Sequence, residues 1–323
     1  MSRYLLLLLS NLFVGTSWAQ LGPTGGRDTS FSIAGSFTKE VKYHPELQLA
    51  HPDLPANVRK TAAQTYKRIP AGRELQLDVF QPTSRKLRPA ILMIHGGGWR
   101  SGDRSHNYTL AGQLAARGYV TVTADYRLST EALYPAAVHD LKAAISWIRR
   151  NAKNYAIDPR KLAVLGFSAG GQLAALIGTT NGNPAFDASG SADSSNVQAI
   201  IDLDGILAFI HPESGEGDDS KSTSAATYWF GYSKTAKPEL WKQGSALTHV
   251  GAATPPTLFL NSSVARMHAG RDDFIAVLNQ HGIYSEVHTF ENAPHTFLFF
   301  EPWFTPTLAY IDGFLRRVFS SSN

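Results

Sequence analysis

Cysteine is absent from this chain of 323 residues. Its absence excludes disulfide bonds, metal sites with thiolate ligands and a cysteine nucleophile. Charged residues are few, at 17%, while hydrophobic residues make up 43% of the chain, a balance that excludes a disordered protein. The sequence also lacks an apolar run of the roughly 20 residues that a membrane-spanning helix needs. We therefore expect a globular protein with a large core and no membrane partner.

Long blocks of like charge are missing too. The 30 lysines and arginines exceed the 26 aspartates and glutamates by four, but they are scattered along the chain. We therefore expect no nucleic-acid partner. Metal-ligand spacing is equally absent, because His211 with Glu213 and Asp218 with Asp219 lie in a polar stretch typical of a solvated loop. We expect no metal.

The first 19 residues have the pattern of a secretory signal peptide. Arg3 supplies positive charge, residues 5–9 and 12–14 are apolar, and Ser17-Trp18-Ala19 ends in a small residue. The pattern predicts cleavage after Ala19 and a secreted or periplasmic protein.

Alternating strand and helix patterns begin at residue 66. They predict an α/β fold, with a mostly parallel sheet and helices on both faces, in which reacting groups gather at the carboxyl ends of the strands. Residues 20–65 read as an N-terminal arm, residues 66–323 as the folded domain, and residues 206–250 as an inserted cap. The expected strands span residues 74–80, 90–94, 119–124, 162–167, 199–203, 257–260 and 285–290, and the expected helices residues 110–117, 136–151, 272–280 and 307–319.

The strand at residues 162–167 leads directly into Gly166-Phe167-Ser168-Ala169-Gly170 and then into a helix-forming stretch. A sharp strand-to-helix turn holds its central serine in a strained backbone conformation, which only small neighbours permit. The turn exposes the serine hydroxyl at the strand tip, so Ser168 is predicted to be a nucleophile. A small-residue turn without chemistry is the alternative.

A glycine loop, His95-Gly96-Gly97-Gly98-Trp99, follows the buried strand at residues 90–94. Consecutive glycines let the backbone approach a ligand and aim N–H groups at one point. With a downstream serine turn, this loop predicts an oxyanion hole formed by the N–H groups of Gly97, Gly98 and Ala169.

The general base is expected late in the chain, on the loop after the last strand. Of the 11 histidines, His295 follows the strand at residues 285–290, whereas His268, His281 and His288 lie on a loop, a helix end and a strand. His295 is therefore predicted to take the proton from Ser168 and return it to the leaving alcohol.

Taken together, these motifs resemble the α/β-hydrolase esterases of the hormone-sensitive-lipase type. Within that group the chain looks most like bacterial carbohydrate esterases, including acetyl xylan esterases. The resemblance covers about residues 66–319 and implies a serine esterase that needs no cofactor. It rests on residues 95–99, Ala124-Asp125-Tyr126-Arg127-Leu128, Ile157-Asp158-Pro159-Arg160, residues 166–171 and Pro294-His295.

The acid of the triad departs from that pattern. The resemblance implies an aspartate shortly after the strand at residues 257–260, but residues 261–266 read Asn-Ser-Ser-Val-Ala-Arg. Asp204, directly after the strand at residues 199–203, is our first candidate. Asp272 is the second, with its neighbour Asp273 in the same place. A turn residue and a helix N-terminal acid are their structural alternatives.

For substrate contacts, Trp99 is a candidate to stack on a sugar ring. Arg266 and Arg271 are candidates to bind a carboxylate on an acidic polysaccharide. The expected substrate is an ester-bearing carbohydrate, with acetyl groups removed from a plant cell-wall polysaccharide or its oligosaccharides. A pectin methylesterase of the same fold, a non-catalytic hydrolase-fold binding protein and a peptidase are the alternatives.

Overall fold

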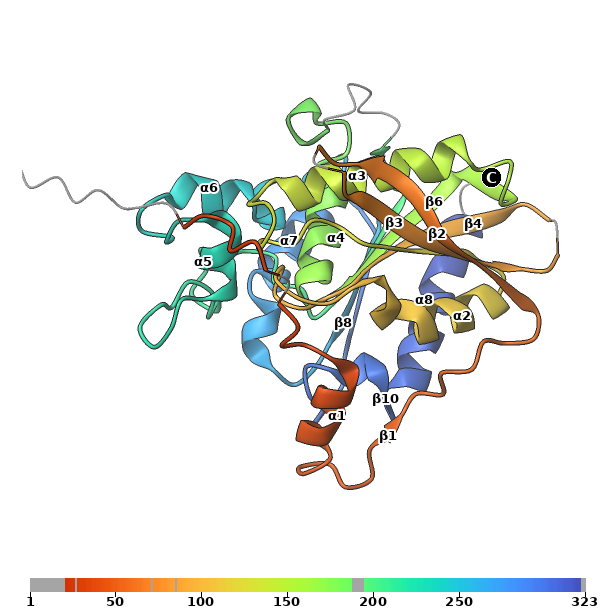
Figure 1. The fold of residues 1–323 in the computed structure, drawn as a ribbon, viewed down its shortest axis with the longest axis horizontal. Coiled ribbons are helices and arrows are strands. Elements are labelled where there is room, and N and C mark those ends of the chain that lie inside the picture. Colours follow the sequence, from red (N-terminus) through yellow and green to blue (C-terminus); the bar gives the residue numbers. More distant parts are fainter. Residues whose placement is uncertain (1–20, 27, 71, 85, 188–194, 321–323) are drawn as a thin grey trace, which may run out of the picture.

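The computed structural model describes residues 21–26, 28–70, 72–84, 86–187 and 195–320. The predicted signal peptide lies outside the described residues. An eight-stranded sheet runs through the centre of the molecule in the order β2-β3-β5-β4-β6-β7-β8-β9 (Figure 1). Its strands are β2 (Val58–Arg68), β3 (Glu74–Pro82), β4 (Arg88–Ile94), β5 (Val120–Ala124), β6 (Ile157–Phe167), β7 (Ala199–Leu203), β8 (Thr257–Asn261) and β9 (Ser285–Thr289).

Most of this sheet is parallel. β3 runs antiparallel to β2 and β5, while every pair from β5 through β4 to β9 is parallel. β5, β7 and β8 are buried at every residue, as expected for strands covered on both faces. This arrangement brings the carboxyl ends of β4, β6, β7 and β8 to one edge of the sheet.

Helices cover both faces, and each face has its own core. One core joins the sheet to α3 (Ala136–Arg150), α4 (Ala169–Thr179) and α7 (Arg271–Gln280). The other joins it to α2 (Tyr108–Ala116) and α8 (Phe304–Ser320). α3 packs by a buried stripe that includes Val138, Leu141, Ile145 and Ile148, the spacing that predicted this helix. The expected α/β class is thus confirmed.

The predicted boundary of the arm at residue 65 is wrong. β2 begins at Val58 and pairs with β3, so the sheet starts inside the predicted arm. N-terminal to it, α1 (Ile33–Glu40) packs on the molecule, and the short β1 (Gln48–Leu49) pairs with β10 (Phe300–Glu301). The segment predicted as a linker therefore contains regular structure that is joined to the domain.

The segment predicted as a cap contains α5 (Ala225–Phe230) and α6 (Pro238–Gln243). Their tryptophans, Trp229 and Trp241, are fully buried and pack with Phe209 and Phe230. These aromatic rings give the segment a core that is continuous with the α3–α4 face of the sheet. Among the described residues, none of the helices combines the length and apolar character that crossing a bilayer requires.

Candidate active site

Ser168 stands at the turn between β6 and α4. Its backbone has φ 56° and ψ −122°, a conformation that L-residues rarely adopt. A Cβ on Gly166 would overlap the carbonyl oxygen of Gly170, and one on Gly170 would overlap that of Ile94. Only glycine fits at both places, so the sequence Gly-x-Ser-x-Gly produces the expected sharp turn with the serine at its tip.

His295 lies beside Ser168, on the loop between β9 and β10. Its Nε2 is 2.9 Å from the Oγ of Ser168, across 127 residues of chain. The imidazole packs against the ring of Phe167, with 4.8 Å between the ring centroids. The structure therefore brings together the two residues that the sequence predicted as nucleophile and base.

Asp204 completes the line of contacts. It follows β7, is fully buried, and places Oδ2 at 2.9 Å from Nδ1 of His295. An ionised carboxylate only accepts hydrogen bonds, so Nδ1 carries the imidazole proton and Nε2 is left to accept from the Ser168 hydroxyl. This is the tautomer that a general base needs.

The alternative acid, Asp272, is not at this site. Its carboxylate accepts from Nε of Arg271 and its side chain is 79% exposed. It stands in the first turn of α7, where negative charge complements the helix dipole. Asp273, the neighbour considered with it, contacts His211 instead. The prediction of Asp272 as second choice is therefore wrong, because the helix turns both carboxylates away from His295.

Two buried carboxyls at the end of β7, Asp202 within the strand and Asp204 directly after it, have pKa values shifted in opposite directions. Burial alone would raise the pKa of the Asp204 carboxyl, but the imidazoles of His268 and His295 and the backbone N–H of Ser262 lower it to about 2. Burial raises the pKa of the Asp202 carboxyl well above its ordinary value, while the N–H of Gly205 bonds to its Oδ1 at 2.8 Å. Asp204 is thus held as the carboxylate, whereas burial favours the protonated form of Asp202.

The loop after β8 holds the second oxygen of Asp204. The N–H of Ser262 donates to Oδ1 at 2.8 Å, and Nδ2 of Asn261 lies 3.5 Å from the same oxygen. Nε2 of His268 lies 3.7 Å from the same oxygen, which is longer than a hydrogen bond. The sequence analysis did not predict these contacts to Asp204. The polar run Asn261-Ser262-Ser263 is the feature that could have indicated them.

The two arginines predicted as substrate contacts do not line the cleft at Ser168. Arg271 donates to Oδ1 of Asn261 at 2.8 Å and to Asp272, so it braces the loop that holds Asp204. Arg266 pairs with Glu216 at 3.4 Å. Both guanidinium groups contact groups of the protein itself, and the role of the two arginines in binding substrate stays a prediction.

Trp99 is also placed elsewhere than expected. Only 4% of its surface is exposed, and its ring stacks on Trp229 with centroids 5.0 Å apart. Nε1 donates to Oε1 of Gln172 at 3.0 Å. A buried ring has no free face for a sugar, so the prediction of Trp99 as a stacking residue is wrong and the ring instead ties the glycine loop to α5.

The glycine loop lies against the serine. Gly97 and Gly98 have φ of 113° and 58°, values that favour glycine, and both line the cleft that contains Ser168 and His295. Between described residues, no hydrogen bond uses the N–H of Gly97, Gly98 or Ala169. Three donors next to the nucleophile are thus available for a developing oxyanion, which is the arrangement the sequence predicted.

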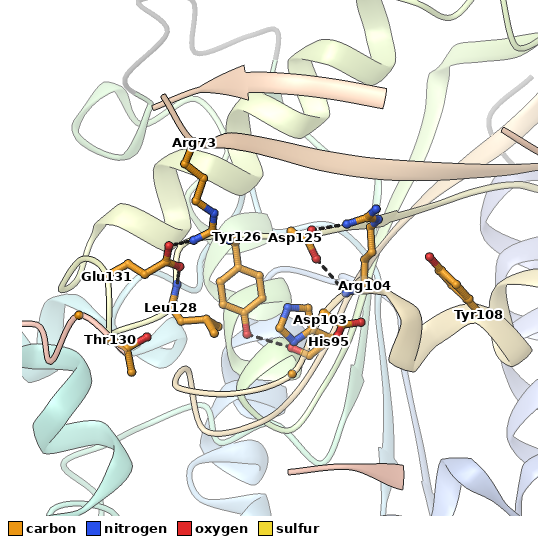
Figure 2. A pocket seen from close by; sticks show the side chains of 12 residues that line it. Arg73, His95, Asp103, Arg104, Tyr108, Asp125, Tyr126, Leu128, Thr130 and Glu131 are labelled. Atoms are coloured by element: carbon orange, nitrogen blue, oxygen red, sulfur yellow. Dashed lines mark hydrogen bonds and ion pairs between the residues drawn. The ribbon is translucent and has the colours of Figure 1, made fainter. Parts of the chain in front are cut away.

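His95 fixes the start of this loop from the far side. Figure 2 shows its ring beside Tyr126, and the two stack with centroids 4.4 Å apart in the wall of a cavity of about 530 Å³. Burial lowers the pKa of the His95 imidazole to about 4, so the ring is neutral at pH 7. The hydroxyl of Tyr126 donates to the His95 carbonyl at 3.0 Å. These contacts hold the loop in place.

The cleft itself is small, with a volume of about 270 Å³. Its walls include the glycine loop, Phe167, Ala225 at the start of α5, and Asp28, Ser30 and Phe31 of the N-terminal segment. Across the stretches of chain that the structure describes, histidine, aspartate and glutamate form no group of three that would hold a metal ion. Ser168, His295 and the glycine loop all line this cleft.

Known proteins are similar to this chain in sequence or in fold. Esterase LipQ of Mycobacterium tuberculosis is 27% identical over 267 residues, which cover 76% of this chain and 62% of LipQ. The chain spans about half to three fifths of the length of the curated relatives it matches first. Among solved structures, Thermogutta terrifontis esterase 2 superposes with a TM-score of 0.66 at 25% identity, covering 83% of this chain and 96% of that one.

A truncated carbohydrate esterase from gut microbiota superposes with a TM-score of 0.68 at 20% identity, covering 83% of this chain and all of that one. Residues 77–267 match the family model named BD-FAE. The match includes the glycine loop, Ser168 and Asp204, and it ends before His295. The resemblance to esterases of the α/β-hydrolase fold is confirmed, and the chain belongs to the BD-FAE family.

Proposed function

We propose that this protein is a carboxylic ester hydrolase that uses Ser168 as its nucleophile. The observation that carries the proposal is the unbroken line of contacts from Ser168 to His295 to Asp204, with 2.9 Å at each step. A small-residue turn without a catalytic role would not require a histidine and an aspartate in line with its serine. The esterase relatives, and the esterase 2 structure that matches at 25% identity, support the same reaction class.

The reaction proceeds in two halves. Oγ of Ser168 attacks the ester carbonyl carbon while Nε2 of His295 takes its proton, and the resulting oxyanion accepts from the N–H groups of Gly97, Gly98 and Ala169. His295 then gives the proton to the departing alcohol, leaving an acyl-serine. Water attacks the acyl-serine with His295 again as base, and the carboxylic acid leaves. Asp204 stabilises the imidazolium formed in each half.

For the substrate we propose short acyl esters, acetyl above all, on a plant cell-wall polysaccharide or its oligosaccharides. A cleft of about 270 Å³ suits a short acyl group. One solved structure with the same fold is a carbohydrate esterase, and the predicted signal peptide would deliver the protein to a polymer outside the cell. Methyl-esterified pectin is the neighbouring candidate.

The two remaining alternatives from the sequence make different predictions. A non-catalytic binding protein has no need of an ionised, buried Asp204, which favours the enzyme over the binding protein. A peptidase would cleave aminoacyl anilides, whereas the esterase leaves them intact.

A panel of acetylated xylan, acetylated mannan and methyl-esterified pectin tests the substrate. Released acetate and released methanol are measured separately, with Ser168→Ala as the control. We expect acetate release that disappears in the variant. Methanol release alone would favour the pectin methylesterase, and neither product from any polymer would contradict the carbohydrate substrate.

We also propose secretion or export to the periplasm, on the pattern of residues 1–19. Mass spectrometry of protein recovered from the periplasm or medium tests it, with Gln20 expected as the first residue. Recovery of the uncleaved chain from the cytoplasm would contradict it.

A further inference from the structure

The N-terminal segment, described at residues 21–26 and 28–31, is fastened beside the cleft and supplies part of its wall. The N–H of Leu21 donates to the carbonyl of Gly231, at the end of α5, at 2.7 Å. Gly25 donates to the carbonyl of Thr130 at 2.8 Å, and Asp28 forms a parallel bridge with Ser101 directly after the glycine loop. In Figure 1 this red segment runs from the α5–α6 region down to α1.

Phe31 stands where this segment meets the cleft. It lines the same space as Ser168 and His295, and its ring packs on His106 and Phe299, with centroids 5.2 Å and 6.2 Å apart. The ring is half-buried, and α1 begins two residues later. A bulky side chain in this position limits how far a substrate can extend along that side of the serine.

Asp28 sets the charge of the cleft. Its Oδ2 lies 3.4 Å from Nε of Arg100, the one arginine or lysine in the described wall of the cleft. The guanidinium of Arg100 stacks on the ring of Tyr228 at 3.9 Å. The N–H of Ser30 donates to Oδ1 of Asp28 at 2.8 Å, which fixes the carboxylate toward the arginine. Among the described residues of this wall, the two charges compensate each other.

We propose that Asp28 and Phe31 are specificity-determining residues: Phe31 restricts the length of the ester arm beside it, and Asp28 neutralises Arg100 so that uncharged esters are preferred. This inference rests on the proposed ester hydrolysis. It assigns part of the substrate selection to a segment that lies outside residues 77–267, the range that matches the family model.

The length effect is tested with Phe31→Ala. kcat/KM is measured on 4-nitrophenyl acetate, butyrate and hexanoate, and on acetates of methanol, 4-nitrophenol and 1-naphthol. In at least one of the two series, we expect kcat/KM on the longest substrate divided by kcat/KM on the shortest to be about tenfold higher in the variant than in wild type. Ratios that stay within twofold of wild type in both series would overturn this part of the proposal.

Phe37→Ala is the matched control. Phe37 is a half-buried aromatic residue on α1 that packs on Phe300 at 5.9 Å and does not line the cleft. Removing it loosens the same N-terminal region without opening the cleft, so the ratios should stay at the wild-type values. If Phe37→Ala raised these kcat/KM ratios as much as Phe31→Ala, the effect would come from a loosened N-terminal region and not from the Phe31 side chain. That result would overturn the proposal.

The charge effect is tested with Asp28→Asn on 4-nitrophenyl hemisuccinate against 4-nitrophenyl acetate. Asparagine keeps the acceptor for the Ser30 N–H but leaves Arg100 uncompensated, so we expect the hemisuccinate-to-acetate ratio of kcat/KM to rise at least fivefold at low salt. An unchanged ratio would overturn this part. Wild-type turnover of 4-nitrophenyl acetate is the shared reference, and its absence would contradict both the inference and the proposed function.

Discussion

Oδ2 of Asp204 lies 2.9 Å from Nδ1 of His295, although 91 residues separate them in the chain. The contact is possible because β7 and β9 end at the same edge of the sheet, with only β8 between them. It identifies the carboxylate that orients the base.

Asp204→Asn should therefore lower kcat about 10²- to 10⁴-fold, because an amide no longer fixes the imidazole tautomer or stabilises its charged form. Asp202→Asn and Asp272→Asn are matched controls, the first buried in β7 two residues before Asp204 and the second exposed on α7. Both should stay within about threefold of wild type. Steady-state kinetics on 4-nitrophenyl acetate measure this. Equal losses in Asp202→Asn and Asp204→Asn would contradict the assignment.

Because Asp202 is buried, we expect it to make the folded protein less stable as the pH rises. Its folded-state pKa is raised by burial, so above about pH 4 the unfolded chain releases a proton that the folded chain keeps. Stability of the wild type then falls as pH rises, by up to about 1.4 kcal/mol per pH unit from this group. In Asp202→Asn this loss is absent.

Urea unfolding of both proteins at pH 5, 6.5 and 8 measures the difference in unfolding free energy. We expect the difference to shift in favour of Asp202→Asn as pH rises. A difference that is constant over this range would mean that Asp202 is ionised in the folded protein.

Gly97→Ala tests the glycine loop. A Cβ at this position would overlap the carbonyl oxygen of Ser101, and φ is 113°, so the loop must move. We expect kcat on 4-nitrophenyl acetate to fall by about 10²-fold or more, the effect of displacing an oxyanion donor. Gly72→Ala is the control, because φ is 88° there but a Cβ would meet nothing within 4 Å. Activity lost equally in both would contradict the prediction.

Because Trp99 is buried, we expect its substitution to lower the stability of the protein and not its binding of sugar. Truncating this buried ring to alanine should cost about 3–5 kcal/mol, while Trp99→Phe should keep much of the packing against Trp229. Thermal unfolding and kinetics on an acetylated oligosaccharide and on 4-nitrophenyl acetate measure both effects. A Trp99→Phe variant with wild-type Tm and a raised KM for the oligosaccharide alone would restore the stacking role.

Much of the sheet could be predicted from the sequence, because buried parallel strands carry continuous apolar runs. β2 could not. It is an edge strand in which only Val58 and Tyr66 are buried, and its register against β3 shifts twice, near Ala63 with φ 55°. These irregularities remove the two-residue periodicity that reveals a half-buried strand.

The triad residues could be predicted because, in this fold, their place after particular strands identifies them. Ser168, His295 and Asp204 each follow a strand whose end was visible in the sequence. The roles of Trp99 and Arg271 depend on distant partners, Trp229 in α5 and Asn261 at the end of β8, which no local pattern reveals. The same holds for Phe31, because a segment rich in glycine, serine and threonine gives no sign that it forms part of the wall of the cleft.

The most direct test of the account is the hydrolysis of 4-nitrophenyl acetate by wild type and by Ser168→Ala, with thermal unfolding measured for both. We expect turnover by wild type, a loss of at least about 10³-fold in kcat/KM for the variant, and the same Tm within about 2 °C. A folded wild type without turnover, or a Ser168→Ala variant that retains wild-type turnover, would contradict the central claim that Ser168 is the nucleophile of an esterase.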